Sequence, residues 1–168
     1  MILILMGVSG VGKTTIGKIL AERTGWQFED ADDYHPESNR EKMASGIPLT
    51  DADRRPWLAV LNGLLANYLQ QEKSAILACS ALKSTYREQL TQGLGMGKVQ
   101  FVALHAPVQV LRERIHARSH QYMNPNLLDS QLATLEESST AWPVSVEGTP
   151  EQTVNEIFKR LQASGFAA

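Results

Sequence analysis

A glycine-rich segment near the start of the chain has the residue types that bind phosphate. Residues 7–14 read GVSGVGKT and fit the pattern G-x-x-x-x-G-K-[ST]. Glycines let the backbone turn its N–H groups inward around phosphate oxygens, where side chains would block the approach. In this pattern Lys13 reaches the β and γ phosphates, and the Thr14 hydroxyl binds Mg²⁺. The residues predicted here to contact a nucleotide are Gly7, Val8, Ser9, Gly10, Val11, Gly12, Lys13, Thr14 and Thr15.

The sequence on either side of this loop supports the same interpretation. The apolar run at 2–6 predicts a buried strand, and residues 13–24 have the apolar spacing of a helix. A helix that begins near Lys13 points the positive end of its dipole at a bound anion. Because a chance match is expected in on the order of 1% of chains of this length, we predict nucleotide binding.

An acidic run follows the next predicted strand, residues 26–29. Asp30 and Asp32 stand at its end, and we expect this strand to lie beside the first one, so that both carboxylates face the γ-phosphate from the acceptor side. There Asp32 can orient an acceptor hydroxyl and take its proton. Asp30 is predicted to bind Mg²⁺ together with Thr14, directly or through water. The alternative is that the run is a solvated turn.

Two other classes of phosphate-loop protein find no support in the sequence. A GTPase needs the strings N-K-x-D and D-x-x-G, and neither occurs. An ATP-driven motor usually has an acid at the end of its third or fourth strand, whereas the corresponding strands here end at Cys79-Ser80 and Leu104-His105. The acids after the second strand favour a kinase of small molecules instead.

Length and composition indicate the kind of protein that would have this activity. The 168 residues predict a single domain covering 1–168, and the net charge of -2 gives no positive field for nucleic acid. No stretch reaches the roughly 20 apolar residues that a membrane span needs. Cys79 is the only cysteine, so no intrachain disulfide can form and a reducing cytoplasm fits best. We interpret Cys79 itself as a core residue.

Strands and helices alternate along the chain, which predicts an α/β fold of three layers with helices on both faces of a parallel sheet of about five strands. The first strand is expected at the centre of the sheet. The predicted strands are 2–6, 26–29, 75–79, 99–104 and 144–146. The predicted helices are 13–24, one from Pro36, one after Asp53, 83–91, one from Pro107, 127–135 and one after the capping box at Thr149.

Several collinear blocks resemble the signatures of bacterial gluconokinases over almost the whole chain. These blocks are Asp32-Asp33-Tyr34-His35-Pro36, Asn39, Lys42-Met43, Gly46-Ile47-Pro48-Leu49, Asp51, Asp53-Arg54, Pro56-Trp57-Leu58, Cys79-Ser80-Ala81-Leu82-Lys83, Tyr86-Arg87, Leu127-Leu128, Ser130-Gln131 and Leu135-Glu136. The resemblance implies phosphorylation of D-gluconate on its 6-hydroxyl with ATP and Mg²⁺. It also implies a P-loop kinase fold like that of nucleoside monophosphate and shikimate kinases, and a homodimer.

A gluconate site must pair a carboxylate with fixed cations and hydroxyls with short polar groups. Arg54, Lys83 and Arg87 are the candidate cations, and His35 beside the acidic run is a candidate contact. Lys83 and Arg87 are four residues apart, so we expect them to share a helix face, from which they could act together. Each of these charges could instead be a solvated surface group.

The predicted lid is the polar segment at about 119–126. Arg114 and Arg118 lead into it and share a helix face. Arg114 is predicted to contact the nucleotide, and Arg118 to close over the transferred phosphoryl group, where it would neutralise developing charge. The alternative is an arginine-rich outer helix face.

Two other functions remain open at this point. A kinase of another small sugar acid or a shikimate-like substrate would use the same phosphate loop and the same acids. A non-catalytic nucleotide-binding regulator would keep the loop and lose the acid on the acceptor side, which this chain retains in Asp32. No nucleic acid or membrane partner is expected.

Overall fold

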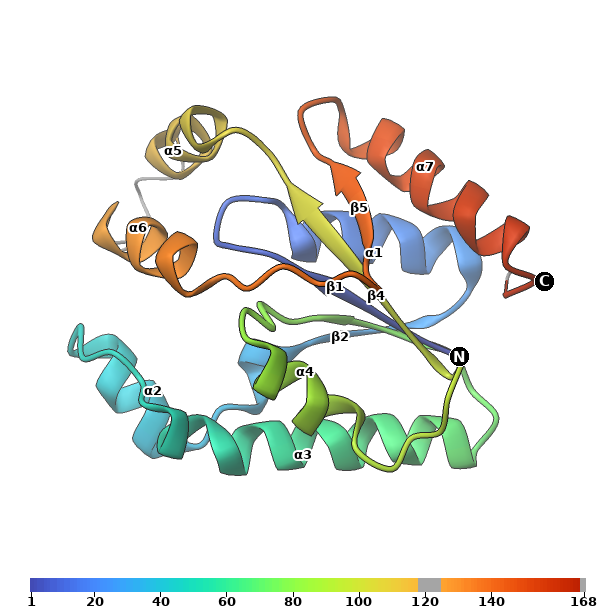
Figure 1. The fold of residues 1–168 in the computed structure, drawn as a ribbon, viewed down its shortest axis with the longest axis horizontal. Coiled ribbons are helices and arrows are strands. Elements are labelled where there is room, and N and C mark those ends of the chain that lie inside the picture. The colour runs from blue at the N-terminus through green and yellow to red at the C-terminus, as the bar shows by residue number, and fades with distance from the viewer. Residues whose placement is uncertain (118–124, 167–168) are drawn as a thin grey trace.

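The computed structural model describes residues 1–117 and 125–166. In this part of the chain five parallel strands form one sheet in the order β2-β3-β1-β4-β5, with helices on both sides of it (Figure 1). The strands are β1 Ile2–Met6, β2 Gln27–Asp30, β3 Ala75–Ala78, β4 Val99–His105 and β5 Trp142–Ser145. The predicted three-layer α/β fold is confirmed.

The central position of β1 follows from its composition. All five of its residues are buried, which matches a strand covered on both faces. It pairs with β3 on one side, with Ile4 opposite Leu77, and with β4 on the other, with Ile4 opposite Phe101. The prediction of a central first strand is confirmed.

The predicted neighbour of β1 was wrong, because β3 lies between β1 and β2. Burial explains the order. β3 consists of Ala75–Ala78, is entirely buried and belongs inside the sheet. β2 alternates polar residues such as Gln27 and Glu29 with Phe28, is only partly buried and occupies an edge, where one side needs no partner strand.

The helices cover the two faces in separate groups (Figure 1). Leu3 and Leu5 of β1 pack in a core with α1, α5, α6 and α7, whereas Ile2 and Ile4 pack in a second core with α3 and α4. This division follows the alternation of side chains along a strand. The helices are α1 Lys13–Thr24, α2 Glu37–Ala44, α3 Asp51–Gln70, α4 Ser84–Thr91, α5 Val108–Ala117, α6 Pro125–Thr134 and α7 Pro150–Ala163, with a short 3₁₀ helix at Ala31–Tyr34.

Capping residues set the beginnings of two helices. The predicted capping box of α7 is present, with Thr149 accepting from the Gln152 N–H and the Gln152 side chain accepting from the Thr149 N–H. A second box, formed by Thr50 and Asp53, begins α3 at Asp51, three residues earlier than predicted.

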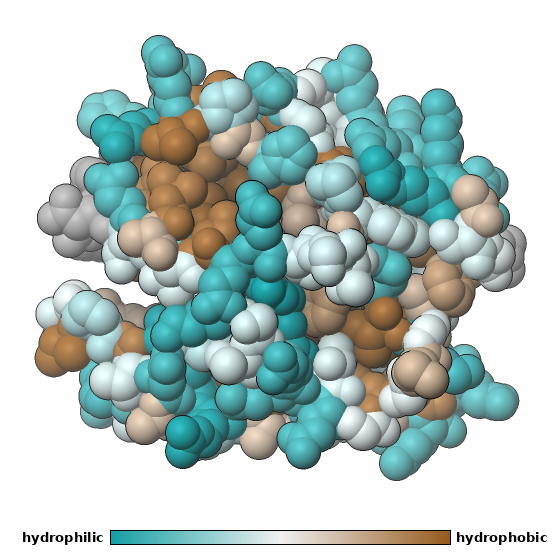
Figure 2. All heavy atoms as spheres, in the orientation of Figure 1, coloured by the Kyte–Doolittle hydropathy of each residue, from teal (hydrophilic) through white to brown (hydrophobic). Residues whose placement is uncertain are grey.

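The predicted lid is not tested by the described helices and strands. Arg118 and most of the predicted lid at 119–126 lie outside the described residues. Figure 2 shows a cleft at the edge of the molecule between α2 on one side and α6 on the other. No helix in the described ranges is long and apolar enough to cross a membrane.

Candidate active site

The glycine-rich loop joins β1 to α1 in a conformation that requires its glycines. Gly7, Gly10 and Gly12 have φ values of 142°, 88° and 87°, which side chains rarely tolerate. A Cβ on Gly7 would lie 2.6 Å from the carbonyl oxygen of Leu104 at the end of β4. The close approach between this loop and β4 therefore depends on the absence of a side chain at position 7.

The first turn of α1 is open to an anion. Gly12 is its N-cap, and no side chain caps the helix, so the first N–H groups keep their hydrogen-bonding capacity for a ligand. The Lys13 ammonium donates to the carbonyls of Gly7 at 2.9 Å and Val8 at 3.2 Å. The loop, the helix terminus and the lysine together fit a polyphosphate group.

Burial lowers the pKa of the Lys13 ammonium, while the carboxylates of Asp32 and Asp30 act in the opposite direction. The predicted phosphate-binding lysine therefore lies within electrostatic reach of the two predicted acids. The loop and the acidic run therefore lie close together.

A direct contact also joins the first turn of α1 to the acidic run. The Thr14 hydroxyl donates a hydrogen bond of 2.8 Å to the carboxylate of Asp30, so the end of β2 reaches α1 although β3 separates the strands. A hydroxyl and a carboxylate are oxygen ligands of the kind that Mg²⁺ prefers. The described residues hold no group of three His, Cys, Asp or Glu side chains suited to a metal ion, so phosphates and water would have to complete its coordination.

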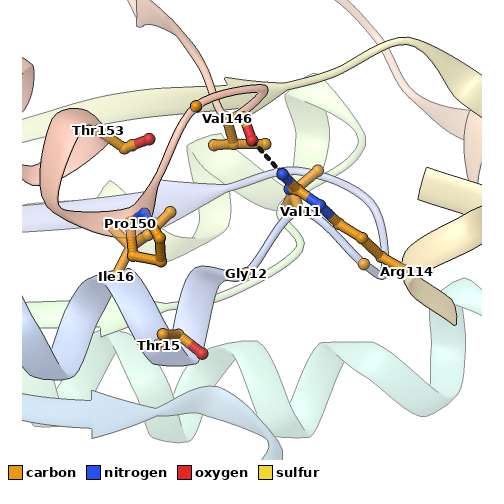
Figure 3. A pocket seen from close by; sticks show the side chains of 10 residues that line it. Val11, Gly12, Thr15, Ile16, Arg114, Val146, Pro150 and Thr153 are labelled. Atoms are coloured by element: carbon orange, nitrogen blue, oxygen red, sulfur yellow. Dashed lines mark hydrogen bonds between the residues drawn. The ribbon is translucent and has the colours of Figure 1, made fainter. Parts of the chain in front are cut away.

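A cavity of about 240 Å³ adjoins the loop (Figure 3). Its lining includes Gly12 and Thr15 on one side, Arg114 of α5, and Val146, Gly148 and Pro150 between β5 and α7. The Arg114 guanidinium donates to the carbonyl oxygen of Val146. The predicted nucleotide contacts Thr15 and Arg114 therefore line one cavity beside the phosphate loop.

The segment from Val146 to Pro150 was missed as a site element by sequence reasoning. The signal that could have located it is the capping box at Thr149, which places a turn directly after the last strand, at the edge of the sheet where ligands bind.

Asp32 lies in the 3₁₀ helix that follows β2. Its backbone N–H donates to the Asp30 carboxylate at 3.1 Å, so Asp30 fixes the direction of the turn. Desolvation by surrounding protein atoms and the negative charge of Asp30 raise the pKa of Asp32. Its side chain is 85% exposed, so water and small solutes reach it, and water limits the size of that rise. An accessible carboxylate with a raised pKa suits proton transfer.

His35 is held rigidly beside Asp32. Its ring stacks on Trp57, with 4.2 Å between centroids, and its Nε2 lies 3.8 Å from an Asp32 carboxylate oxygen. The Asn39 amide nitrogen faces His35 Nδ1 at 3.3 Å and donates to the carbonyl oxygen of Asp53 at 3.0 Å. Since that nitrogen can only donate, Nδ1 accepts and the His35 proton sits on Nε2, on the side of Asp32.

Burial, with the positive charges of Arg54 and Arg40, lowers the pKa of His35 to about 4. The imidazole is therefore neutral at pH 7. Asn39 and Trp57, which set its tautomer and its plane, were not predicted as site residues, although both stand in the blocks that carry the family resemblance.

A polar cluster lies at the start of α3 and α4. The Lys83 ammonium contacts both carboxylate oxygens of Asp51, at 3.0 and 3.1 Å, and the Tyr86 hydroxyl donates to the same carboxylate. These hydrogen bonds lower the pKa of Asp51. The Arg54 guanidinium lies 5.5 Å from the centre of the Tyr86 ring and donates to the carbonyl oxygen of Leu49. Two predicted cations, Arg54 and Lys83, thus lie around Tyr86.

Arg87 and Lys83 do not share a helix face as predicted. Lys83 precedes α4 in an extended conformation, so it is not on the helix face. The Arg87 side chain is buried, and its guanidinium donates to the backbone carbonyls of Ala81, Leu82 and Glu137. Arg87 therefore holds loop backbone in place, and its contact with a substrate stays a prediction.

Comparisons with known proteins agree with this geometry. A family model described as "AAA domain" matches residues 2–140. The chain is 41% identical to "Probable gluconokinase" of Dictyostelium discoideum, over 96% of this chain and 86% of that protein. It is 44% identical to "Gluconokinase" of Gluconobacter oxydans, over 96% and 91% of the two chains.

A solved structure shows the same likeness in three dimensions. A gluconokinase from Sinorhizobium meliloti superposes with a TM-score of 0.85 at 39% identity, covering 96% of this chain and 91% of the other. The phosphate loop, the acids after β2 and the identity across nearly the whole length lead to one conclusion: the chain belongs to the gluconokinase family of P-loop kinases.

Proposed function

We propose that this protein transfers the γ-phosphoryl group of ATP to the 6-hydroxyl of D-gluconate and forms 6-phospho-D-gluconate. The observation that carries the proposal is the hydrogen bond from Thr14 to Asp30, which joins the phosphate loop to the acidic turn. Family membership supplies the sugar acid. Relatives named gluconokinase cover nearly the full chain, which does not favour the alternatives of another substrate or a non-catalytic regulator.

On the nucleotide side, the uncapped first turn of α1 and the loop N–H groups bind the phosphates, and Lys13 exchanges its loop carbonyls for phosphate oxygens. Arg114 and Thr15 contact the nucleoside in the adjoining cavity. Thr14 and Asp30 hold Mg²⁺, which when bound offsets the negative charge on the phosphates. Arg118 is proposed to contact the transferred group.

On the acceptor side, Asp32 accepts the proton of the 6-hydroxyl as that oxygen attacks phosphorus. Because His35 carries its proton on Nε2 and stays neutral, this N–H faces Asp32 and is proposed to donate to a substrate hydroxyl without adding charge. Arg54, Lys83 and Arg87 are the proposed cations for the gluconate carboxylate. Lys83 is half-buried and held by Asp51, so it is oriented before substrate arrives.

The proposal extends to the number of subunits, the cellular location and the metal requirement of the protein. We expect the 168 residues to act as one kinase domain, in the cytoplasm, as a homodimer that requires Mg²⁺. Light scattering coupled to gel filtration measures the number of subunits. Omission of Mg²⁺ from the assay, with excess chelator, is expected to abolish turnover.

An ADP-release assay over a panel of sugar acids, polyols and glucose tests the function. Gluconate should give the highest kcat/KM, and Lys13→Ala should lose on the order of 10²-fold to 10³-fold in kcat because a cation that stabilises the transition state is removed. Lys18→Ala is the matched control, since Lys18 is exposed on the same helix. Equal turnover of gluconate and glucose would contradict the proposal.

A further inference from the structure

Residues 131–137, which we name the strut, connect two parts of the site that lie far apart in the sequence. They comprise the end of α6 and the segment after it. We propose that the strut couples nucleotide binding to gluconate binding, with Gln131 and Glu136 as positioning residues. This inference rests on the proposed function, because it assigns one end of the strut to each substrate.

At its first end the strut holds the phosphate loop. The Ser9 N–H donates a hydrogen bond of 2.6 Å to Gln131 Oε1, across 122 positions of sequence. Leu128, one turn earlier on α6, is 2% exposed and packs in the same core as Val8 and Val11 of the loop. The loop backbone is thus fixed to α6 by one hydrogen bond and by apolar contact.

The connection between the two ends is short and hydrogen-bonded. The Leu135 N–H donates to the Gln131 carbonyl at 2.9 Å, so the last turn of the helix runs directly into Glu136. A shift of Gln131 that follows Ser9 must therefore move Glu136, unless this turn breaks.

At its second end the strut holds the loop that carries Lys83. The Glu136 N–H donates to the carbonyl oxygen of Leu82 at 2.8 Å. The Glu136 carboxylate accepts from the Ser84 N–H at 2.7 Å and caps α4, whose own N-cap residue Lys83 provides no cap. Hydrogen bonding from the backbone and side chain of Ser84 lowers the pKa of Glu136.

The loop held in this way has a strained backbone. Ala81 has a φ of 45°, a left-handed conformation that a residue with a Cβ keeps only when its surroundings enforce it. Arg87 supplies part of that enforcement, because its guanidinium contacts the carbonyls of Ala81, Leu82 and Glu137. The strut and Arg87 together fix the position of the backbone at Lys83.

Both ends of the strut thus bind backbone groups. A nucleotide that orders the phosphate loop would therefore also fix the position of Gln131. Through the last turn of α6, it would fix the positions of Glu136 and of the loop that carries Lys83. Binding free energies are reciprocal, so gluconate must raise nucleotide affinity by the same factor. The expected coupling in the unaltered protein is about fivefold or more, the lower end of common values.

Isothermal titration of gluconate with and without a non-hydrolysable ATP analogue measures this factor directly. Gln131→Met removes the acceptor at nearly constant volume, and Glu136→Ala removes the cap of α4. Each should reduce the factor to below about twofold. Glu136→Gln should restore it, since an amide oxygen still accepts from Ser84. Because the two variants alter opposite ends, one that fails to fold leaves the other as the test.

Matched controls separate the strut from general damage to the helix. Ser130→Ala changes an exposed residue on α6, and Glu137→Ala leaves the backbone oxygen that Arg87 contacts. Both should keep the original factor. The proposal is overturned if the unaltered protein shows no coupling, or if Gln131→Met and Glu136→Ala keep its factor. Failure of the unaltered protein to bind gluconate at all would instead contradict the proposed function.

Discussion

The hydroxyl of Thr14, in the first turn of α1, donates to the carboxylate of Asp30 at the end of β2 over 2.8 Å. In the sheet, β3 separates β1 from β2. The first turn of α1 and the end of β2 nevertheless meet at the edge of the sheet. This contact joins the phosphate loop and the acidic turn in one site.

Asp30→Asn keeps an oxygen that can accept from Thr14 but removes the negative charge. We expect the Mg²⁺ concentration for half-maximal activity to rise about tenfold, equivalent to about 1.4 kcal/mol, while the unfolding temperature changes little. A magnesium titration of initial rates gives this value. Asp33→Asn removes an exposed carboxylate from the same run and should behave like the unaltered protein. The same magnesium dependence in both variants would exclude a role for Asp30 at the metal.

Gly7→Ala tests whether the loop needs its first glycine. The new Cβ would lie 2.6 Å from the Leu104 carbonyl oxygen at a φ of 142°, so the loop must shift. We expect a loss of about 2 kcal/mol in unfolding free energy and loss of nucleotide binding, measured by urea denaturation and by titration with ATP. Gly63→Ala, in open space on α3, should stabilise the protein by up to about 1 kcal/mol. Unchanged ATP affinity in Gly7→Ala would contradict the assigned geometry.

His35 should make stability depend on pH between about 4 and 6.5. Its pKa is lowered to about 4 in the folded protein from 6.5, so in this range the unfolded chain binds more protons and the unfolding free energy rises with pH. The full shift corresponds to about 3 kcal/mol, present above pH 6.5 and lost as pH falls toward 4.

His35→Phe keeps a ring to stack on Trp57 and removes the titrating group. Its unfolding free energy should therefore rise by about 3 kcal/mol less over this range, measured by urea denaturation at several pH values. His116→Gln alters an exposed histidine and should keep the original slope. The paired carboxylate of Asp53, with its pKa lowered to about 2 chiefly by its hydrogen bond from Lys42, titrates below this window. An identical slope in His35→Phe would show that His35 is not buried in a neutral form.

The sequence was sufficient to predict the bounds of an element where its hydrophobic pattern and its flanking residues agree. The bounds of β1 and α1 match the prediction to the residue. An apolar run defines the strand, and the helix lies between the glycine-rich loop and Gly25. The position of β2 was not predicted correctly, although its polar residues indicate an edge strand. The early start of α3 was missed because Asp53, rather than the more common Glu or Gln, completes its capping box.

The site was less accessible to prediction than the fold. The sequence shows that a residue is basic, but it does not show which groups that residue contacts. Arg87 contacts carbonyl oxygens in two loops, and one of them, at Glu137, is 50 positions away. The contact between Ser9 and Gln131 likewise depends on tertiary packing across 122 positions. Such contacts follow from the arrangement of whole elements, which local spacing does not specify.

Arg118 stays a prediction from the sequence, because it lies outside the described residues. Arg118→Ala should lower kcat on the order of 10²-fold and change the KM for gluconate far less, as expected for a contact made mainly in the transition state. Steady-state kinetics at saturating ATP distinguish the two parameters. Arg112→Ala breaks an exposed pair with Asp129 at 2.9 Å and should leave both nearly unchanged. An effect of Arg118→Ala confined to KM would refute this role.

The central claim is the identity of the reaction, and phosphorus NMR of the product tests it most directly. Incubation with ATP, Mg²⁺ and D-gluconate should give a single phosphomonoester on the 6-hydroxyl, with ADP formed in equal amount, and Lys13→Ala should form this product on the order of 10²-fold to 10³-fold more slowly. A phosphate on another hydroxyl, or ADP formed equally fast without gluconate, would contradict the account.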